Sequence, residues 1–194
     1  PPDEGRRELV GAFVGARLDD AIHVDLEVAG ADGRLDPVPV DLAALAADAA
    51  LVWAARCADA GVRFAVAAAP TAVVRADPRR LRQVVDGLAE NALRVTPRGA
   101  PLVVATGGDH TASWLQVRDG GPGFAPEDYP VVFERGVLHD RYRGRRPVGS
   151  GGVGLALVHG LVVRMGATVA AAPAPEGGAC FTVTFPVADR TVRR

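Results

Sequence analysis

Apolar and polar positions repeat along the chain with two different periods, which together predict helices and strands. Residues at helical spacing predict three helices, over 41–61, 78–95 and 151–165. Asp41 and Asp77 are acidic N-caps for the first two, and Pro78 follows at the first helical position. Short apolar or alternating runs predict six strands, at 62–68, 71–76, 101–107, 112–119, 167–173 and 179–187.

The order of these elements predicts an α+β fold. Two strands follow each helix, which favours a two-layer α/β sandwich: a mixed β-sheet with helices on one face. A helical turn is expected within 126–135. Residues 6–28 carry apolar side chains at helical spacing, and 29–39 have the glycines and prolines of a linker. We therefore expect a helix end plus linker at 1–36, one domain at 37–188 and a tail at 189–194.

Composition narrows the class of protein. Of the 194 residues 48% are hydrophobic and 23% charged, as in globular domains. The net charge of -1 gives no general attraction to nucleic acid or anionic membranes, so no nucleic-acid partner is expected. All 22 basic residues are arginine, so any cationic contact to phosphate has to come from arginine. Cys57 and Cys180 lie in apolar surroundings and are expected to be buried free thiols in a reducing compartment.

Targeting signals are also missing from the sequence. No apolar run is long enough to span a bilayer, and no signal-peptide pattern is present. Because the chain begins with Pro-Pro, we expect it to be a piece of a longer protein. We therefore expect a cytoplasmic domain, one that a membrane-anchored sensor could carry.

The predicted helix 78–95 carries a polar stripe beside its apolar face. Gln83, Gly87, Asn91 and Arg94 follow one another at spacings of three and four residues. An amide oxygen and a guanidinium on one stripe suit Mg²⁺ and phosphates. The alternative is that Asn91 is a core amide satisfied by a neighbouring group.

The stretch VRDGGPGF, 117–124, places one acid at the end of a predicted strand. Alternation puts Asp119 on the same face as Leu115 and Val117, at the rim of an apolar layer. There its carboxylate can accept a hydrogen bond from an exocyclic amine such as that of adenine, with Gly121 and Gly123 turning the backbone beneath the ring. The alternative is an ordinary Asp-Gly turn.

A third candidate is the glycine-rich start of the last helix, GSGGVGLALV, 149–158. Backbone N–H groups exposed at such a helix start can hold phosphate, although a tight loop requires the same residues. Four arginines precede it and predict either a solvated face or a lid over a triphosphate: Arg141, Arg143, Arg145 and Arg146.

These pieces occur in the order found in the ATP-binding domain of sensor histidine kinases, within the superfamily of gyrase, Hsp90 and MutL. The stretch 81–99 resembles the N box, 117–124 the G1 box, VFERG at 132–136 the F box and 149–158 the G2 box. PVDLAAL, 39–45, resembles the entry to the domain. The resemblance covers about residues 37–187 and implies a Bergerat-type ATP-binding fold with ATP and Mg²⁺ as cofactors.

The resemblance also implies roles for single residues. Asn91 would coordinate Mg²⁺, Arg94 would approach the phosphates, and Asp119 would bind adenine in a pocket shaped by Gly121 and Gly123. Cys180 lies near a position where relatives often have threonine beside the adenine. Residues of the lid region would complete the ATP site: Phe133, Gly152, Gly154 and Leu155.

Two departures from the family pattern bear on activity. Gly87 stands where the N box usually has Asn, His or Glu, and Glu90 points about 100° away from Asn91 on a helix. We therefore expect no efficient ATP hydrolysis, which argues against a mechanical ATPase of the gyrase or MutL kind. The G2 box also has a less regular alternation of glycines than is usual, which leaves lid geometry and ATP affinity open.

The phosphoacceptor is the largest departure. Histidine kinases use a histidine followed by an acid on the first helix of a dimerisation hairpin, and none of the four histidines lies in that context: His23, His110, His139 and His159. The implied function is therefore the catalytic domain of a homodimeric histidine kinase, without catalytic side chains of its own. It would act on a histidine in a helical hairpin of the same protein, and the phosphoryl group would pass to a response-regulator receiver domain. The alternatives are a degenerate nucleotide-binding or interaction module, or a serine kinase of the anti-sigma-factor type.

Overall fold

The computed structural model describes residues 34–69, 73–134 and 153–186. All of its described helices and strands belong to the unit Asp36–Arg194. Helix α2 spans Leu42–Ala60, α3 spans Pro78–Val95 and α5 spans Val153–Arg164, and a short 3-10 helix, η1, spans Pro126–Val131. No helix within these ranges is both long and apolar enough to cross a bilayer.

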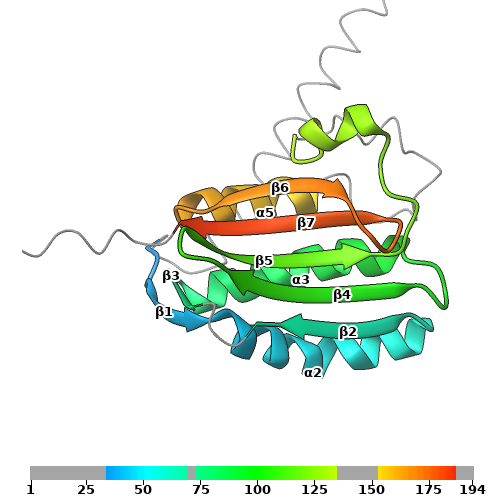
Figure 1. Cartoon of the computed structure of the whole chain (residues 1–194), viewed down its shortest axis with the longest axis horizontal. Helices are drawn as coiled ribbons and strands as arrows, with labels where there is room; N and C mark the ends of the chain where they lie inside the picture. The colour runs from blue at the N-terminus through cyan, green and yellow to red at the C-terminus, as the bar shows by residue number, and fades with distance from the viewer. Residues whose placement is uncertain (1–33, 70–72, 135–152, 187–194) are drawn as a thin grey trace, which may run out of the picture. The chain divides into compact units, whose positions relative to one another are not determined.

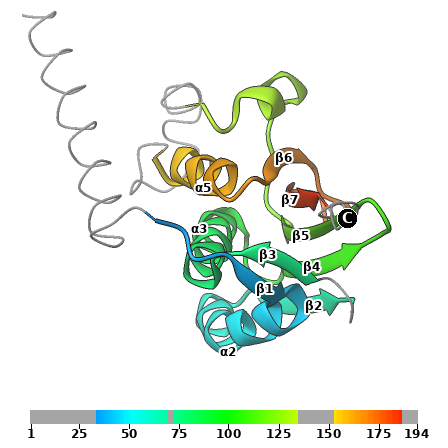
Figure 2. The same cartoon turned by 90° about the vertical axis from the view of Figure 1, so that its left-hand side faces the viewer.

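A mixed five-stranded sheet forms one layer of the domain, with the strand order β2-β4-β5-β7-β6. Strands β2 and β4 are parallel, and every other neighbouring pair is antiparallel. Helices α2, α3 and α5 lie together on one side of this sheet (Figures 1 and 2). The strands are Arg63–Ala68 (β2), Pro101–Gly108 (β4), Ala112–Asp119 (β5), Thr168–Pro173 (β6) and Ala179–Pro186 (β7). The predicted α+β sandwich is confirmed.

A separate two-stranded sheet was only half predicted. Val38–Asp41 is strand β1 and pairs antiparallel with β3, Val73–Ala76, outside the five-stranded sheet. The prediction that the linker reaches residue 39 is therefore wrong. Pro37 and Pro39 gave the segment the composition of a linker, but a two-stranded sheet consists of edge strands, where a proline without an N–H is tolerated.

The caps that the sequence predicts begin the first two helices. Asp41 Oδ1 accepts hydrogen bonds from the backbone N–H groups of Ala43 and Ala44, at 2.8 and 3.3 Å, and α2 ends at Gly61 with a φ of 70°. Asp77 accepts from the N–H groups of Arg79 and Arg80, at 3.0 and 3.1 Å. Desolvation opposes ionisation of Asp77, yet these backbone hydrogen bonds hold its pKa below the ordinary value.

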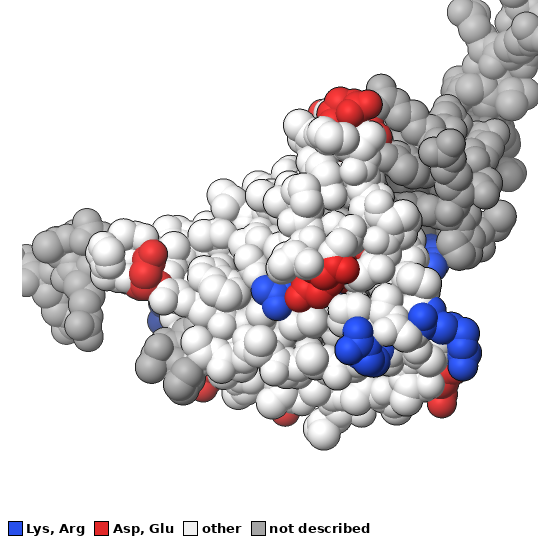
Figure 3. All heavy atoms as spheres, turned by 45° about the vertical axis from the view of Figure 1, so that its right-hand side comes forward, with Lys and Arg blue, Asp and Glu red and all other residues white. Residues whose placement is uncertain are grey.

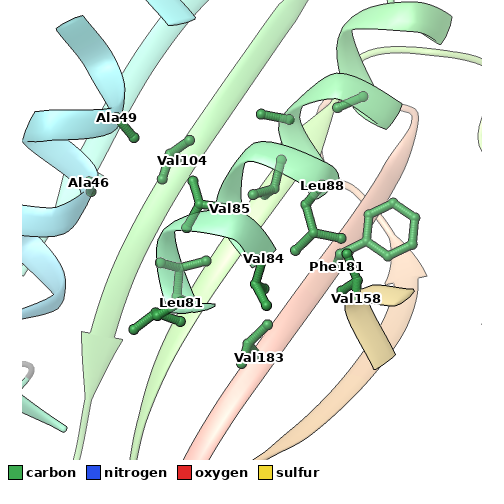
Figure 4. Packing of buried hydrophobic residues seen from close by; sticks show 14 of the residues in the cluster. Ala46, Ala49, Leu81, Val84, Val85, Leu88, Val104, Val158, Phe181 and Val183 are labelled. Atoms are coloured by element: carbon green, nitrogen blue, oxygen red, sulfur yellow. The ribbon is translucent and has the colours of Figure 1, made fainter. Parts of the chain in front are cut away.

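The core lies between the helices and the sheet (Figure 4). Helix α3 is central, because its apolar face contacts strands of the sheet while its flanks contact α2 and α5. Fully buried side chains come from every layer, and those labelled in Figure 4 include Ala46 and Ala49 of α2, Leu81, Val84, Val85 and Leu88 of α3, Val104 of β4, Val158 of α5, and Phe181 and Val183 of β7. The packing fixes where each polar side chain of α3 points.

Candidate functional site

Asp119 lies at the end of β5 on the helix-covered face of the sheet. Burial alternates along β5, and Asp119 is only 1% exposed, on the side of the buried Leu115 and Val117. Its Oδ1 atom accepts a hydrogen bond of 2.9 Å from the N–H of Gly121. The predicted face is therefore correct, and the carboxylate is buried at the end of the strand.

The turn between β6 and β7 closes over this carboxylate, a contact that sequence reasoning missed. Gly178 donates its N–H to the main-chain oxygen of Asp119 at 3.0 Å, and its own carbonyl accepts from Ala174 at 2.8 Å. A β-carbon on residue 178 would overlap the Asp119 carboxylate. The sequence marks a turn at Pro-Glu-Gly-Gly but carries no local signal that links it to Asp119.

Gly121 and Gly123 are closely packed against neighbouring residues, which leave little room for a side chain at either position. A β-carbon on Gly121 would lie 2.9 Å from the carbonyl oxygen of Val95, at the end of α3. Gly123 has a φ of 65°, and its β-carbon would lie 3.1 Å from the hydroxyl of Tyr129. Both positions therefore need glycine, and Gly121 brings the loop after β5 against the C-terminal end of α3.

One side of α3 faces α5. A β-carbon on Gly87 would approach Cγ2 of Val158 in α5 to 3.0 Å, which is tighter than ordinary packing. Asn91, one helical turn further on, is half-buried, and its side-chain amide has no hydrogen-bond partner within the described part of the chain. Among the described residues, therefore, no core neighbour satisfies the amide.

The opposite side of α3 faces α2 through a polar network. The indole N–H of Trp53 donates to Asp86 at 2.8 Å, and Arg56 pairs with Glu90 at 2.6 Å. Arg94 lies 3.7 Å from the second oxygen of Glu90. Glu90 is therefore held toward α2, away from the Gly87–Asn91 side, as its helical position predicts. Arg94 lies in the last turn of α3, and its side chain is partly buried.

An aromatic cluster joins the loop after β5 to the sheet and to α5. Phe133 packs edge-to-face on Phe181 with ring centroids 6.0 Å apart, and stacks at a tilt on His159 at 5.8 Å. Phe124 contacts both Phe181 and Tyr129 edge-to-face, at 6.3 and 5.5 Å. Phe133 is thus anchored where the chain leaves the described loop toward residues 135–152.

The remaining predicted site residues fall at the start of α5 or outside the described ranges. Gly154 is exposed in the first turn of α5, with nothing within 4 Å of where a β-carbon would stand, whereas Leu155 is 8% exposed and part of the core. Gly152 and the four arginines of 141–146 lie outside the described residues, as do His23 and His139. His110 and His159 are both exposed.

Cys57 and Cys180 are free and buried, as predicted. Burial raises the pKa of each thiol. Cys180 pairs in register with Arg118, so it lies on the open face of the sheet, opposite to Asp119. Its thiol contacts the hydroxyl of Thr182 at 3.6 Å.

A magnesium ion held mainly by nucleotide phosphates fits the donors available here. Among the described residues no group of three or more His, Cys, Asp or Glu side chains could hold a metal ion by itself. Mg²⁺ in phosphate-transfer sites commonly has one or two protein ligands and takes the rest from water and phosphates. The amide of Asn91, which has no hydrogen-bond partner among the described residues, offers one oxygen of this chemical type.

Charged groups are scattered over the part of the surface shown in Figure 3. Acidic and basic side chains lie among uncharged ones, and no patch of a single sign covers the described residues seen there. No extended basic surface is therefore seen on the described residues in this view.

Comparisons with known proteins give one consistent picture. The sequence profile of the family described as histidine kinase-, DNA gyrase B-, and HSP90-like ATPase matches residues 76–189. The chain is 35% identical over 132 residues to sensor histidine kinase component HK1 of Mycobacterium tuberculosis, covering 68% of this chain and 76% of that protein. It is 36% identical over 163 residues to the adaptive-response sensory kinase SasA of Synechococcus, covering 80% of this chain but 41% of that protein.

Solved structures agree with the sequence comparisons. The mycobacterial sensor histidine kinase MprB superposes with a TM-score of 0.64 at 25% identity, over 78% of this chain and 97% of that one. Full-length ShkA in complex with AMPPNP superposes with a TM-score of 0.66 at 29% identity, over 78% of this chain and 31% of that one. The chain thus spans less than half of the longer relatives that it matches.

Proposed function

The chain belongs to the family of histidine kinase-, DNA gyrase B- and HSP90-like ATPases and carries the ATP-binding catalytic domain of a sensor histidine kinase, and we propose that Asp119 and Asn91 form its ATP·Mg²⁺ site. The buried Asp119 carboxylate would accept the adenine amine, with Gly121 and Gly123 beneath the ring. Asn91 would contribute one oxygen ligand to Mg²⁺, and Arg94 would neutralise phosphate charge. Phe133, Gly152, Gly154 and Leu155 would form the two ends of the lid.

The observation that carries this proposal is the burial of Asp119. A carboxylate that is 1% exposed, at a strand end and against glycines, is costly unless it is hydrogen-bonded. The Gly121 N–H satisfies Oδ1, and an exocyclic amine would add a donor to the same carboxylate. Gly121 also contacts the end of α3, so an adenine at Asp119 would direct its phosphates along the helix that bears Asn91 and Arg94.

The proposed reaction is phosphoryl transfer by positioning and charge neutralisation. Mg²⁺, when bound, would neutralise charge on the phosphates. On the α5 side of α3, residue 87 is glycine, and Glu90 is paired with Arg56 on the α2 side. No carboxylate of α3 is therefore placed to activate water beside Asn91, which supports transfer to a histidine over hydrolysis.

The wider setting belongs to the same proposal. The acceptor histidine would lie in a dimerisation hairpin of the same protein, and the full protein would act as a homodimer. A response-regulator receiver domain would accept the phosphoryl group in turn. The domain would be cytoplasmic and could be part of a membrane-anchored sensor. The sensor-kinase names of the relatives support this setting.

Isothermal titration calorimetry with ATP, with and without Mg²⁺, tests the site. Asp119→Asn should weaken ATP binding roughly 10- to 100-fold, because a hydrogen bond to a charged acceptor contributes about 1.5–3 kcal/mol. Asp109→Asn is the matched control. Asp109 also accepts backbone hydrogen bonds, but it lies just before the first residue of β5, at the end of the strand away from Asp119. Failure of the unmutated chain to bind ATP would favour a degenerate interaction module.

A further inference from the structure

The turn that covers Asp119 is fastened to β5 by one ion pair. Glu176 lies in the turn between β6 and β7, and its Oε1 atom is 3.2 Å from Nη2 of Arg118, the residue directly before Asp119. The two side chains are mostly buried, with 23% exposed for Arg118 and 16% for Glu176. The pair therefore joins the turn to the strand on the open face of the sheet, opposite to the Asp119 carboxylate.

The hydrogen bonds of the turn show what the ion pair holds in place. Gly177 donates to the carbonyl of Ala174, Ala174 donates to that of Gly178, and Gly178 donates to that of Asp119, all between 2.8 and 3.0 Å. Glu176 stands at the middle of this turn. A shift of the turn away from β5 would break the Gly178–Asp119 bond and remove the wall that Gly178 forms against the carboxylate.

The ion pair is not arranged for maximum stability. Arg118 Nε and Glu176 Oε2 are both buried, and neither has a hydrogen-bond partner among the described residues. A mostly buried pair that leaves a donor and an acceptor unsatisfied is a poor source of folding free energy. Its clearest structural consequence is geometric, because it ties residue 176 to residue 118.

We propose that Arg118 and Glu176 are positioning residues for the nucleotide base: their ion pair keeps the β6–β7 turn against Asp119, so that the carboxylate is aimed at the exocyclic amine of adenine. This inference rests on the proposed ATP site at Asp119. Arg118 and Glu176 act through Gly178 and Asp119 and do not themselves touch the nucleotide. Loss of the pair lowers both the affinity for ATP and the preference for an amine over a carbonyl on the purine ring.

Two substitutions to glutamine test this directly, because they change the net charge of the protein in opposite directions. Arg118→Gln removes a positive charge and Glu176→Gln removes a negative one, while both break the ion pair. A general electrostatic effect on the triphosphate would weaken ATP binding in the first variant and strengthen it in the second. Loss of positioning weakens binding in both, by about 5-fold or more, since contacting residues that act as a unit are strongly coupled.

The purine preference gives a readout that folding stability does not move. ITP has a carbonyl where ATP has the amine, so the ratio of the Kd values for ITP and ATP measures how well Asp119 reads that group. We expect this ratio to fall in both variants. Arg82→Gln is the matched control, because it removes an ion pair with Asp86 on the α2-facing side of α3 and should leave both Kd values unchanged.

Circular dichroism and thermal melts of each variant establish that it is folded at the temperature of the titration. The charge-swapped double variant Arg118→Glu/Glu176→Arg restores the pair and should recover most of the ATP affinity. If both single variants bind ATP and ITP as the unmutated chain does, whatever their melting temperatures, the positioning role is wrong. If the unmutated chain fails to bind ATP, or Asp119→Asn binds it normally, the nucleotide site itself is wrong and this inference is overturned with it.

Discussion

Gly178 and Asp119 fit together only because residue 178 has no side chain: a β-carbon there would overlap Oδ1 of Asp119, while the backbone N–H of Gly178 donates to the Asp119 carbonyl. The residues are 59 positions apart in the sequence: Asp119 ends β5, and Gly178 lies in the turn between β6 and β7. In the proposed site their contact would form one wall around the adenine amine.

Gly178→Ala should therefore abolish measurable ATP binding and lower the free energy of unfolding by about 1–3 kcal/mol, the usual cost of overpacking. Gly160→Ala is the control, because Gly160 lies within α5 with open space around it and alanine there should stabilise the helix by about 0.5–1 kcal/mol. Urea denaturation and calorimetry measure the two quantities. Normal ATP affinity in Gly178→Ala would show that the turn is not part of the pocket.

The unpartnered amide of Asn91 leads to a second prediction. Asn91→Ala should lose the gain in ATP affinity that Mg²⁺ provides, because the amide oxygen would be the protein's ligand to the ion in the proposed site. Binding of adenosine, which has no phosphates, should be unchanged. Gln83→Ala, on the same stripe of α3 but about two turns earlier, should keep its dependence on Mg²⁺. A full magnesium effect in Asn91→Ala would exclude the assigned role.

Gly87 allows α5 to approach α3 closely, which gives a prediction on stability. Alanine in an open helical position gains about 0.5–1 kcal/mol over glycine, but a β-carbon at position 87 would press on Val158 at 3.0 Å. Gly87→Ala should therefore stabilise less than Gly160→Ala, or destabilise.

A double-mutant cycle with Val158→Ala isolates this crowding. The double variant should be more stable than the sum of the single effects by about 0.5 kcal/mol or more. Additive effects in urea denaturation would mean that α5 adjusts freely around residue 87.

Asp109 gives a prediction on pH. Hydrogen bonds from the hydroxyl and the backbone N–H of Thr111, and from the N–H of Ala112, lower the pKa of Asp109 from 3.8 to about 2. The lowered pKa means that the folded state favours the ionised carboxylate. The stability it adds is complete above pH 3.8 and is lost as the pH falls toward 2.

The difference in free energy of unfolding between the unmutated chain and Asp109→Ala should thus be constant above about pH 5 and shrink between about pH 4 and pH 2. Urea denaturation at a series of pH values measures it. A difference that stays constant down to pH 2 would contradict the assigned hydrogen bonds.

Local chemistry explains which elements could be predicted from the sequence. Asp41 and Asp77 cap helices through hydrogen bonds to residues two and three positions away, so a short stretch of sequence is enough to predict the caps. The face of Asp119 follows from strict alternation along β5. Strand β1 was missed because Pro39 within it and Pro37 just before it resemble the prolines of a linker, and only its pairing with β3 makes it a strand.

The parts of the site that were missed depend on contacts between distant segments. The sequence shows that Gly87 differs from the family pattern. It does not show that Val158 occupies the space beside Gly87, because that contact depends on how α3 packs against α5. The same is true of Gly178, whose partner is set by the pairing of β5 with β7. Neither contact has a periodicity or a spacing that could reveal it.

The cap of α3 also fastens the point where the chain enters the domain. Asp77 accepts the N–H of Asp36 with one carboxylate oxygen while the other caps the helix, and Arg75 donates to the carbonyl of Pro37. The first residue of the unit Asp36–Arg194 is therefore hydrogen-bonded to the same side chain that caps α3. One carboxylate thus joins residue 36 to the helix that bears Asn91, so removal of the Asp77 side chain would release both contacts at once.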